Sequence, residues 1–379
     1  MKHEDYTIGW ISALAEEIAA AKGMLDEEHP RLHYVDDSNQ YTLGRIGHHN
    51  IVLVCLPEGR YGTTAAAVVA KEMQNTFKSV RFGLMVGIGG GVPKLPECDI
   101  RLGDVVVGKP TDIHGGVIQY DIGKATQDGK FKRVGALNSA PTFLLTAVSD
   151  LKSKHLQKGN EILKHVSQMI GKHPAMQPQY EYQGTQHDRL FKASYAHGAG
   201  STCAECDTNQ LLHRGLARQS PKIHYGLIAS GNQVIKDAET RDRLRARSSD
   251  EGVGEILCFE MEAAGVLNDF PCLVIRGICD YADSHKNKDW QHRAAATAAA
   301  YAKELICVMA SGRVSNPQTT QEMSKADGEL ISRLLILPAQ AAMLRCSVHI
   351  DVEIGTVTLR KPPLQCVARL TRFRLTCRT

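Results

Sequence analysis

Six short apolar runs recur along the first three-quarters of the chain. Each has the length of a buried strand and is bounded by polar or glycine-containing residues. The predicted strands are residues 6–11, 51–56, 82–88, 104–108, 224–229 and 272–278.

The segments between these runs have helical periodicity. In residues 63–77 the apolar positions of one stripe are Ala66, Val69, Ala70, Met73 and Phe77. Residues 13–25, 141–170 and 290–311 also predict helices. Strands that alternate with helices are typical of an α/β domain. We therefore expect a three-layer sandwich, in which a central mixed, mostly parallel sheet is flanked by helices.

Two stretches depart from this alternation. Residues 171–220 are polar and rich in His, Tyr, Gln and Gly, which indicates a long excursion from the core. After Gly312 the composition changes: residues 313–328 form a polar linker, and residues 347–354 alternate strictly between apolar and polar side chains, as a half-buried strand does. We predict a catalytic domain over 1–312, and over 313–379 a linker with a basic appendage of unknown role.

Composition narrows the functional classes. The net charge of +4 over 379 residues is small for a nucleic-acid-binding protein. No run approaches the ~18 uninterrupted apolar residues of a membrane span, and the N-terminus has no signal-like segment. Several of the eleven cysteines lie inside apolar runs. The cysteine pattern indicates reduced thiols and a cytoplasmic protein. From the small net charge and the lack of long apolar runs we expect no nucleic-acid or membrane partners.

The polar residues that carry candidate chemistry follow four of the predicted strands. They lie in residues 12–17, 87–91, 230–233 and 279–283. If the strands are parallel, their carboxyl ends meet at one edge of the sheet, where α/β proteins bind ligands. Residues 259–263 add Glu260 and Glu262, which we expect at the head of a helix.

These residues together resemble the purine nucleoside and uridine phosphorylase superfamily, most of all its methylthioadenosine/adenosylhomocysteine nucleosidase branch. The Glu-Met-Glu-Ala run at 260–263 is the most specific match, followed by the strand that ends at Asp280, the glycines of 87–91 and Leu-Ala-Glu-Glu at 14–17. The resemblance covers about residues 6–312 and implies the nucleoside phosphorylase fold. Residues 226–233 are closest to fungal members, many of which are fused to signalling modules.

The resemblance assigns roles to three acids. Asp280 would protonate N7 of a departing purine, which requires that the acid hold its proton, as burial favours. Glu262 would accept hydrogen bonds from the ribose 2′ and 3′ hydroxyls, with Met261 on the sugar face. Glu17 would orient and deprotonate water. In the alternative reading, Asp280 caps a strand end, and the two glutamates are ordinary acids at helix N-termini.

The resemblance also implies further substrate contacts. Ile88, Gly89 and Gly90 would form a wall beside the ribose and the nucleophile. Val234, with its neighbours Asn232 and Ile235, occupies the place where the nucleosidase branch often has an aromatic residue stacked on the base. Valine cannot stack, so the remaining candidates are Trp290, Tyr281 and Tyr120.

The nucleophile is expected to be water. Phosphorylases of this superfamily usually carry an arginine for phosphate where this chain has Met85, and a phosphate would lose that charge-assisted partner. Arg45, Arg60 or Arg81 remain alternative phosphate contacts. We therefore predict a purine nucleosidase that needs no cofactor and forms a homo-oligomer, a dimer or larger. The alternatives are a purine nucleoside or uridine phosphorylase and a nucleoside-sensing or interaction module with weak activity.

A Cys-x-x-Cys pair lies in the polar excursion. Cys203 and Cys206 have the spacing of a zinc knuckle, and His187, His197 and His213 are near in sequence. No second cysteine pair has a matching spacing, and the histidine spacings are irregular. The sequence therefore favours packed thiols in a loop, assigns no metal, and leaves a metal at this pair open.

Overall fold

The structure is a computed structural model. It describes residues 1–32, 37–111, 113–127, 131–182, 184–198, 200, 202–216, 218, 220–286 and 288–310, with four strands beyond residue 346. The chain divides into two compact units, Met1–Asn316 and Pro317–Thr379. Each unit is described by itself.

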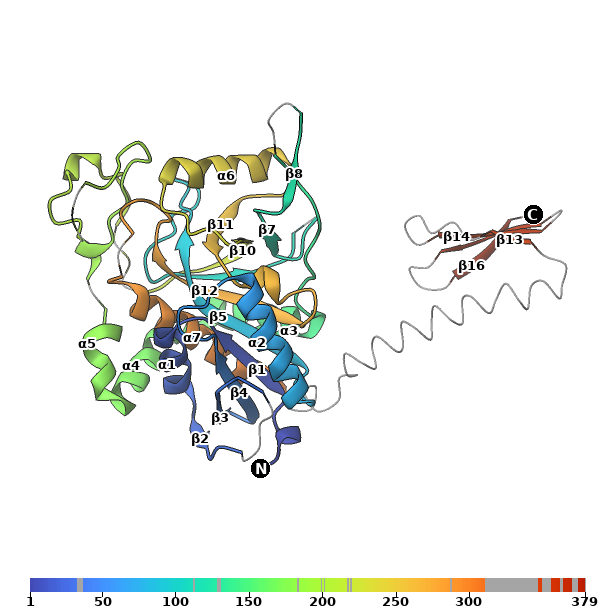
Figure 1. Cartoon of the computed structure of the whole chain (residues 1–379), viewed down its shortest axis with the longest axis horizontal. Coiled ribbons are helices and arrows are strands. Elements are labelled where there is room, and N and C mark those ends of the chain that lie inside the picture. The colour runs from blue at the N-terminus through green and yellow to red at the C-terminus, as the bar shows by residue number, and fades with distance from the viewer. Residues whose placement is uncertain are drawn as a thin grey trace. The chain divides into compact units, whose positions relative to one another are not determined.

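A ten-stranded mixed sheet is the centre of the first unit (Figure 1). Its order is β11-β10-β6-β12-β5-β1-β4-β3-β2, and β7 pairs with β10. Six of the ten described strand pairings are parallel. The strands are β1 (Ile8–Ser12), β2 (Glu27–His29), β3 (Tyr41–Ile46), β4 (His49–Cys55), β5 (Phe82–Gly91), β6 (Val105–Gly108), β7 (Val117–Gln119), β10 (Ile223–Ser230), β11 (Ile256–Glu260) and β12 (Cys272–Asp280). A separate hairpin joins β8 (Gly123–Ala125) to β9 (Phe131–Arg133).

The sheet closes on itself through its longest strand. The last part of β5 pairs with β11, where Gly90 lies opposite Phe259 and Gly91 opposite Cys258. Strands β11, β10, β6, β12 and β5 therefore form a ring. The mixed sheet with its helices is confirmed, whereas the open three-layer sandwich is not, because a closed ring is not a flat middle layer.

Helices cover both faces of the sheet. On one side α1 (Ala15–Met24), α3 (Thr142–Lys158), α4 (Ile162–Lys172) and α7 (Gln291–Val308) share a core with Trp10 of β1. On the other side α2 (Thr63–Thr76) shares a core with Ile11 of the same strand. Neighbouring residues of a strand point to opposite faces, which is why one fully buried strand supplies both cores. Helix α6 (Ala238–Asp250) and the short α5 (Gln177–Tyr180) complete the unit (Figure 1).

All six predicted strands and the predicted helices are present, with three corrections. The glycines of 87–91 do not follow the strand predicted over 82–88, because β5 continues through them. Glu260 does not head a helix: it ends β11, and only the 3₁₀ turn Ala263–Gly265 follows. The predicted helix over 141–170 is two helices, since Gly159 ends α3 at a φ of 75° that other residues rarely adopt.

The polar excursion contains little regular structure. Its described part holds the end of α4, the short α5, 3₁₀ turns at Pro174–Met176, Thr185–His187 and Thr208–Gln210, and an isolated β-bridge between Phe191 and Leu211. The second unit is a four-stranded antiparallel sheet in the order β13 (Ser347–His349), β14 (Thr356–Lys361), β15 (Leu364–Arg369) and β16 (Arg374–Arg378). The predicted strand over 347–354 thus begins as β13, and residues 350–354 lie outside the described residues.

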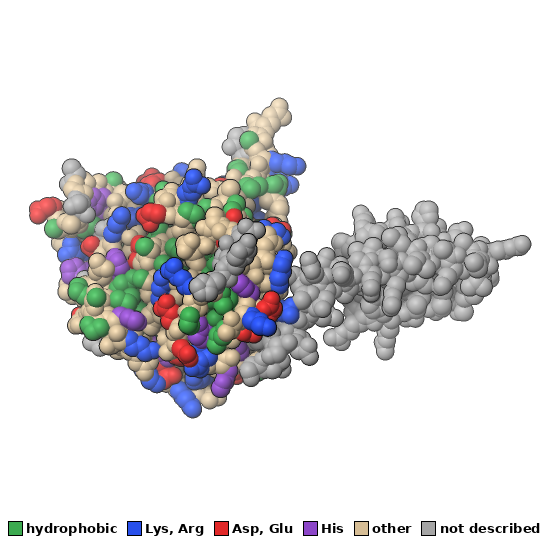
Figure 2. Space-filling model, turned by 60° about the horizontal axis from the view of Figure 1, so that its bottom comes forward, with side chains coloured by type: hydrophobic (Ala, Val, Ile, Leu, Met, Phe, Trp, Pro, Cys, Tyr) green, Lys and Arg blue, Asp and Glu red, His purple; other side chains and the backbone are tan. Residues whose placement is uncertain are grey.

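On the face drawn in Figure 2, acidic and basic side chains of the first unit are interspersed, in keeping with the small net charge. None of the described helices has the length and apolar character needed to cross a bilayer. The described cysteines of the first unit are free thiols.

Candidate active site

A cavity of about 340 Å³ lies where the ends of β1, β5, β11 and β12 converge. Nine of the ten site residues expected from the sequence line it: Glu17, Ile88, Gly89, Gly90, Val234, Ile235, Met261, Glu262 and Asp280. The convergence does not need parallel strands, because β11 runs antiparallel to β5 and reaches the cavity through closure of the ring.

Asn232 is the tenth expected residue, and it does not line the cavity. Its side-chain oxygen accepts hydrogen bonds from the backbone N–H and the hydroxyl of Thr63, both at 3.1 Å. Asn232 therefore satisfies the first free N–H of α2, which is the ordinary role of a capping side chain.

Glu17 is a buried carboxylate held by three backbone N–H groups. Its Oε2 accepts from Ala13 at 2.7 Å and Leu14 at 3.0 Å, and its Oε1 accepts from Ile88 at 2.8 Å. Burial raises the pKa of Glu17, although Arg276 and the three N–H groups oppose this shift. A carboxylate with a raised pKa is a stronger base than an exposed one.

Arg276 is fully buried in β12 at the centre of an acidic cluster. Its Nη2 donates to Glu260 and lies 3.6 Å from Oε2 of Glu262, and the charge of Glu17 also acts on it. Its Nε and Nη1 have no hydrogen-bond partner among the described residues. Gly87 makes room for this cluster: a Cβ there would lie 2.5 Å from both Arg276 Nη1 and Glu17 Oε1.

The two glutamates at the end of β11 both line the cavity but make different contacts. Glu260 accepts from the backbone N–H groups of Glu262 at 3.1 Å and of Ala263, besides binding Arg276. These contacts are structural. Glu262 is 6% exposed and faces the cavity, and the N–H of Gly62 donates to it at 3.4 Å. The pKa of Glu262 is raised to about 7. Burial is the largest cause, the charge of Glu260 also raises the pKa, and the charge of Arg276 lowers it.

Asp280 ends β12 and lines the same cavity. Its Oδ1 accepts from the N–H of Ala282 at 2.9 Å, and its Oδ2 lies 2.7 Å from Nζ of Lys286. Ala282 has a φ of 49°, a strained value for a residue with a side chain. A Cβ on Gly90 would lie 2.8 Å from Oδ1, so glycine is needed opposite the carboxylate. Asp280 therefore caps a turn and also faces the cavity.

Lys286 was not anticipated from the sequence. It lines the same cavity, and its pKa is raised: burial lowers it, but the charge and hydrogen bond of Asp280, together with the charges of Cys279 and Asp283, outweigh burial. The only sequence signal is a lysine six residues after the candidate acid, in a turn whose path the sequence does not reveal.

The aromatic residues of the cavity differ from the expected ones. Tyr120 is buried and donates its hydroxyl to the carbonyl of Gln233, Tyr281 bonds Asp188, and Trp290 lines a different cavity. Two other aromatic residues do line the site beside Val234, which is 43% exposed: these are Phe259 and Tyr61.

No described arginine lines the cavity. Met85 is fully buried in β5, and Arg45, one of the three alternative phosphate contacts, pairs with Glu27 at 2.9 Å. Arg60 and Arg81 are likewise absent from the lining. The basic residues among the described lining are Lys236, Lys286 and Lys288.

Comparison with known proteins adds to this geometry. A family model described as the phosphorylase superfamily matches residues 7–307. A nucleotide-binding leucine-rich repeat (NLR)-like protein of Hyaloscypha variabilis is 46% identical over 308 residues, which make up 81% of this chain. The chain spans only 30% of the length of that relative. A 5′-methylthioadenosine/S-adenosylhomocysteine nucleosidase of Mycobacterium bovis is 24% identical over 315 residues, 79% of this chain and 95% of that protein.

Solved structures share the fold. The 5′-methylthioadenosine/S-adenosylhomocysteine nucleosidase of Neisseria meningitidis, in complex with methylthio-immucillin-A, superposes with a TM-score of 0.51 at 17% identity, over 79% of this chain and 98% of that one. The futalosine hydrolase of Helicobacter pylori gives a TM-score of 0.50 at 18% identity, over 80% and 99% of the two chains.

Proposed function

Because this chain belongs to the phosphorylase superfamily, we propose that its cavity hydrolyses the N-glycosidic bond of a purine nucleoside and releases free base and ribose. The observation that carries the proposal is that Glu17, Glu262 and Asp280 line one cavity while Arg276 is already surrounded by carboxylates.

The residues that line the cavity suit the two halves of a nucleoside. Asp280 meets the base and supplies the proton that neutralises the leaving group, in a cavity that Phe259 and Val234 also line. Glu262 accepts hydrogen bonds from the ribose hydroxyls, and Met261 packs on the sugar. Cleavage makes the ribose cationic, a charge that nearby carboxylates stabilise.

Water fits the nucleophile position better than phosphate does. Glu17, Glu260 and Glu262 place three acidic groups around the single guanidinium of Arg276. A phosphate dianion would add negative charge beside this cluster, in which carboxylates outnumber the guanidinium. A water molecule avoids this cost. It would give its proton to Glu17, which lines the cavity and whose pKa is raised by burial.

The proposal is tested by base release from adenosine, inosine, guanosine and uridine, with and without phosphate. We expect purine release at the same rate in both buffers, with free ribose as the second product. If ribose 1-phosphate accumulates and release stops without phosphate, the enzyme is a phosphorylase and the electrostatic argument is wrong.

The NLR-like relative favours a second candidate, a nucleoside-sensing module within a longer protein. In that case calorimetry would detect nucleoside binding to the wild-type chain while base release stays at the uncatalysed rate. Turnover of the bound nucleoside would exclude a module that only senses.

A further inference from the structure

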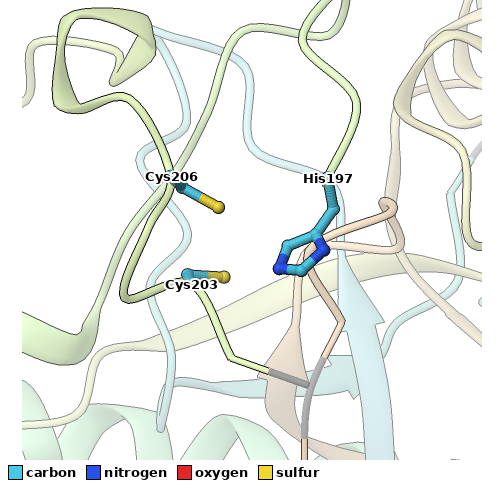
Figure 3. A group of neighbouring side chains, drawn as sticks. All are labelled: His197, Cys203 and Cys206. Atoms are coloured by element: carbon cyan, nitrogen blue, oxygen red, sulfur yellow. The ribbon is translucent and has the colours of Figure 1, made fainter. Parts of the chain in front are cut away.

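Three metal-ligating side chains meet in the polar excursion, outside the cavity described above. The ligand atoms of His197, Cys203 and Cys206 all lie within 4.8 Å of one another. Figure 3 shows the imidazole and the two sulfur atoms directed toward a common point. His197 comes from a separate part of the loop, which is why the irregular histidine spacing of the sequence did not reveal it.

We propose that His197, Cys203 and Cys206 bind one Zn²⁺ ion. Two thiolates and an imidazole are typical ligands of zinc. The harder cations Mg²⁺ and Ca²⁺ bind oxygen ligands instead. Each thiol gives up its proton when it binds, so formation of the site releases two protons.

A neutral His197 has one ring nitrogen with a lone pair free for a metal. One ring nitrogen lies 2.7 Å from the carbonyl of Gly198 and the other 3.0 Å from that of Thr202. A neutral imidazole has one N–H and cannot donate to both carbonyls. With zinc on one nitrogen, the other donates its N–H to a carbonyl, which is the usual arrangement around a zinc-bound histidine.

Water supplies the fourth tetrahedral position. Among the described residues no fourth His, Cys, Asp or Glu joins the group. Cys203 instead borders a cavity of about 320 Å³, which Arg189 and Asp283 also line. A site with three protein ligands and one water is a known zinc geometry.

The zinc ion connects the excursion to the turn that follows Asp280. The backbone N–H of His197 donates to the hydroxyl of Ser284 at 2.9 Å, and Sγ of Cys203 lies 3.8 Å from the carbonyl of His285. The next residue is Lys286, whose ammonium group contacts Asp280. Zinc at this cluster would therefore fix the loop against the segment that holds Lys286 in place.

Zinc content tests the proposal directly. The full chain is purified under reducing conditions, and its zinc is measured by plasma mass spectrometry. We expect about one zinc per chain, as a single site requires. Replacement of zinc by Co²⁺ should give thiolate-to-cobalt charge-transfer bands. Cys206→Ser and His197→Ala should lose the metal and these bands, whereas Cys307→Ser, which changes an exposed thiol elsewhere, should keep both.

Three results would overturn the proposal. The first is a folded wild-type chain that contains no zinc and gives no cobalt bands. The second is a Cys203→Ser, Cys206→Ser double variant that keeps its zinc. The third is a wild-type chain without metal in which mass spectrometry finds Cys203 and Cys206 joined as a disulfide after purification under reducing conditions. The first and third results come from the wild-type chain, so they can refute the proposal even if a variant misfolds.

Discussion

Replacing Glu262 by Gln is the most selective perturbation of the proposed sugar site. Glutamine keeps the size of the side chain, and its oxygen still accepts from the N–H of Gly62. Arg276 retains its direct partner Glu260. The fold should therefore survive, and the change removes one negative charge at the point where the ribose hydroxyls would bind.

The size of the effect follows from the bond that is lost. A hydrogen bond to a charged group contributes about 1.5–3 kcal/mol, which corresponds to a roughly 10- to 150-fold fall in kcat/KM. A 2′-deoxynucleoside lacks one of the two hydroxyls and has already lost that contact. The substitution should therefore reduce kcat/KM for the riboside much more than for the deoxyriboside.

The assay compares adenosine with 2′-deoxyadenosine for the wild type and for Glu262→Gln. Glu255→Gln is the matched control, because Glu255 is a surface carboxylate paired with Lys94 at 2.8 Å. The control should leave both substrates unaffected. Equal losses on the two sugars in Glu262→Gln would refute the diol role and would point to a general electrostatic effect.

Three further predictions concern the same cavity. Asp280→Asn should lower kcat by about 10²–10⁴-fold, the usual contribution of a general acid, whereas near-normal turnover at saturating substrate would reduce Asp280 to a cap for Ala282. In a pH profile, kcat/KM should rise from about pH 6 to pH 8, because the pKa of Glu262 is raised to about 7 and its ionised form accepts the ribose hydroxyls; a flat profile over this range would contradict that role. In urea unfolding, Arg276→Met should lower the free energy of unfolding by about 3–5 kcal/mol, because it leaves buried carboxylates unpaired. Adding Glu260→Gln should recover part of this loss, and simple addition of the two single losses would show that the pair is not coupled.

Sequence patterns predicted the elements that depend on local residues. The apolar strands and the amphipathic α2 follow from periodicity, and β1 buries all five of its residues. Strand β3 escaped prediction because Thr42, Gly44 and Arg45 interrupt its apolar pattern. Strand β11 escaped prediction because Glu260 at its end and Glu262 after it resemble the acidic start of a helix. What decides β11 is its pairing with β5, a contact between distant segments that no local pattern encodes.

The electrostatics of the site were beyond the sequence for the same reason. Arg276 was visible only as a lone charge in an apolar strand. Its acidic neighbours come from α1 and from the end of β11, so its charge balance exists only once the ring has closed. Likewise, Lys286 contacts Asp280 only because the turn after β12 brings the two side chains together.

The glycines of β5 connect a misread element to the chemistry. The sequence predicts that the strand ends at residue 88, whereas β5 continues through Gly91. The physical reason for glycine is nevertheless close approach: at Gly87 a side chain would collide with Glu17 and Arg276, and at Gly90 with Asp280. The proposed base, Glu17, and the proposed acid, Asp280, thus both lie close to β5. The glycines of this strand have no side chains and leave room for the two carboxylates. The strand pairings hold these backbone positions in place, so the distance between the proposed acid and the proposed base is set by the rigid sheet and not by a mobile loop.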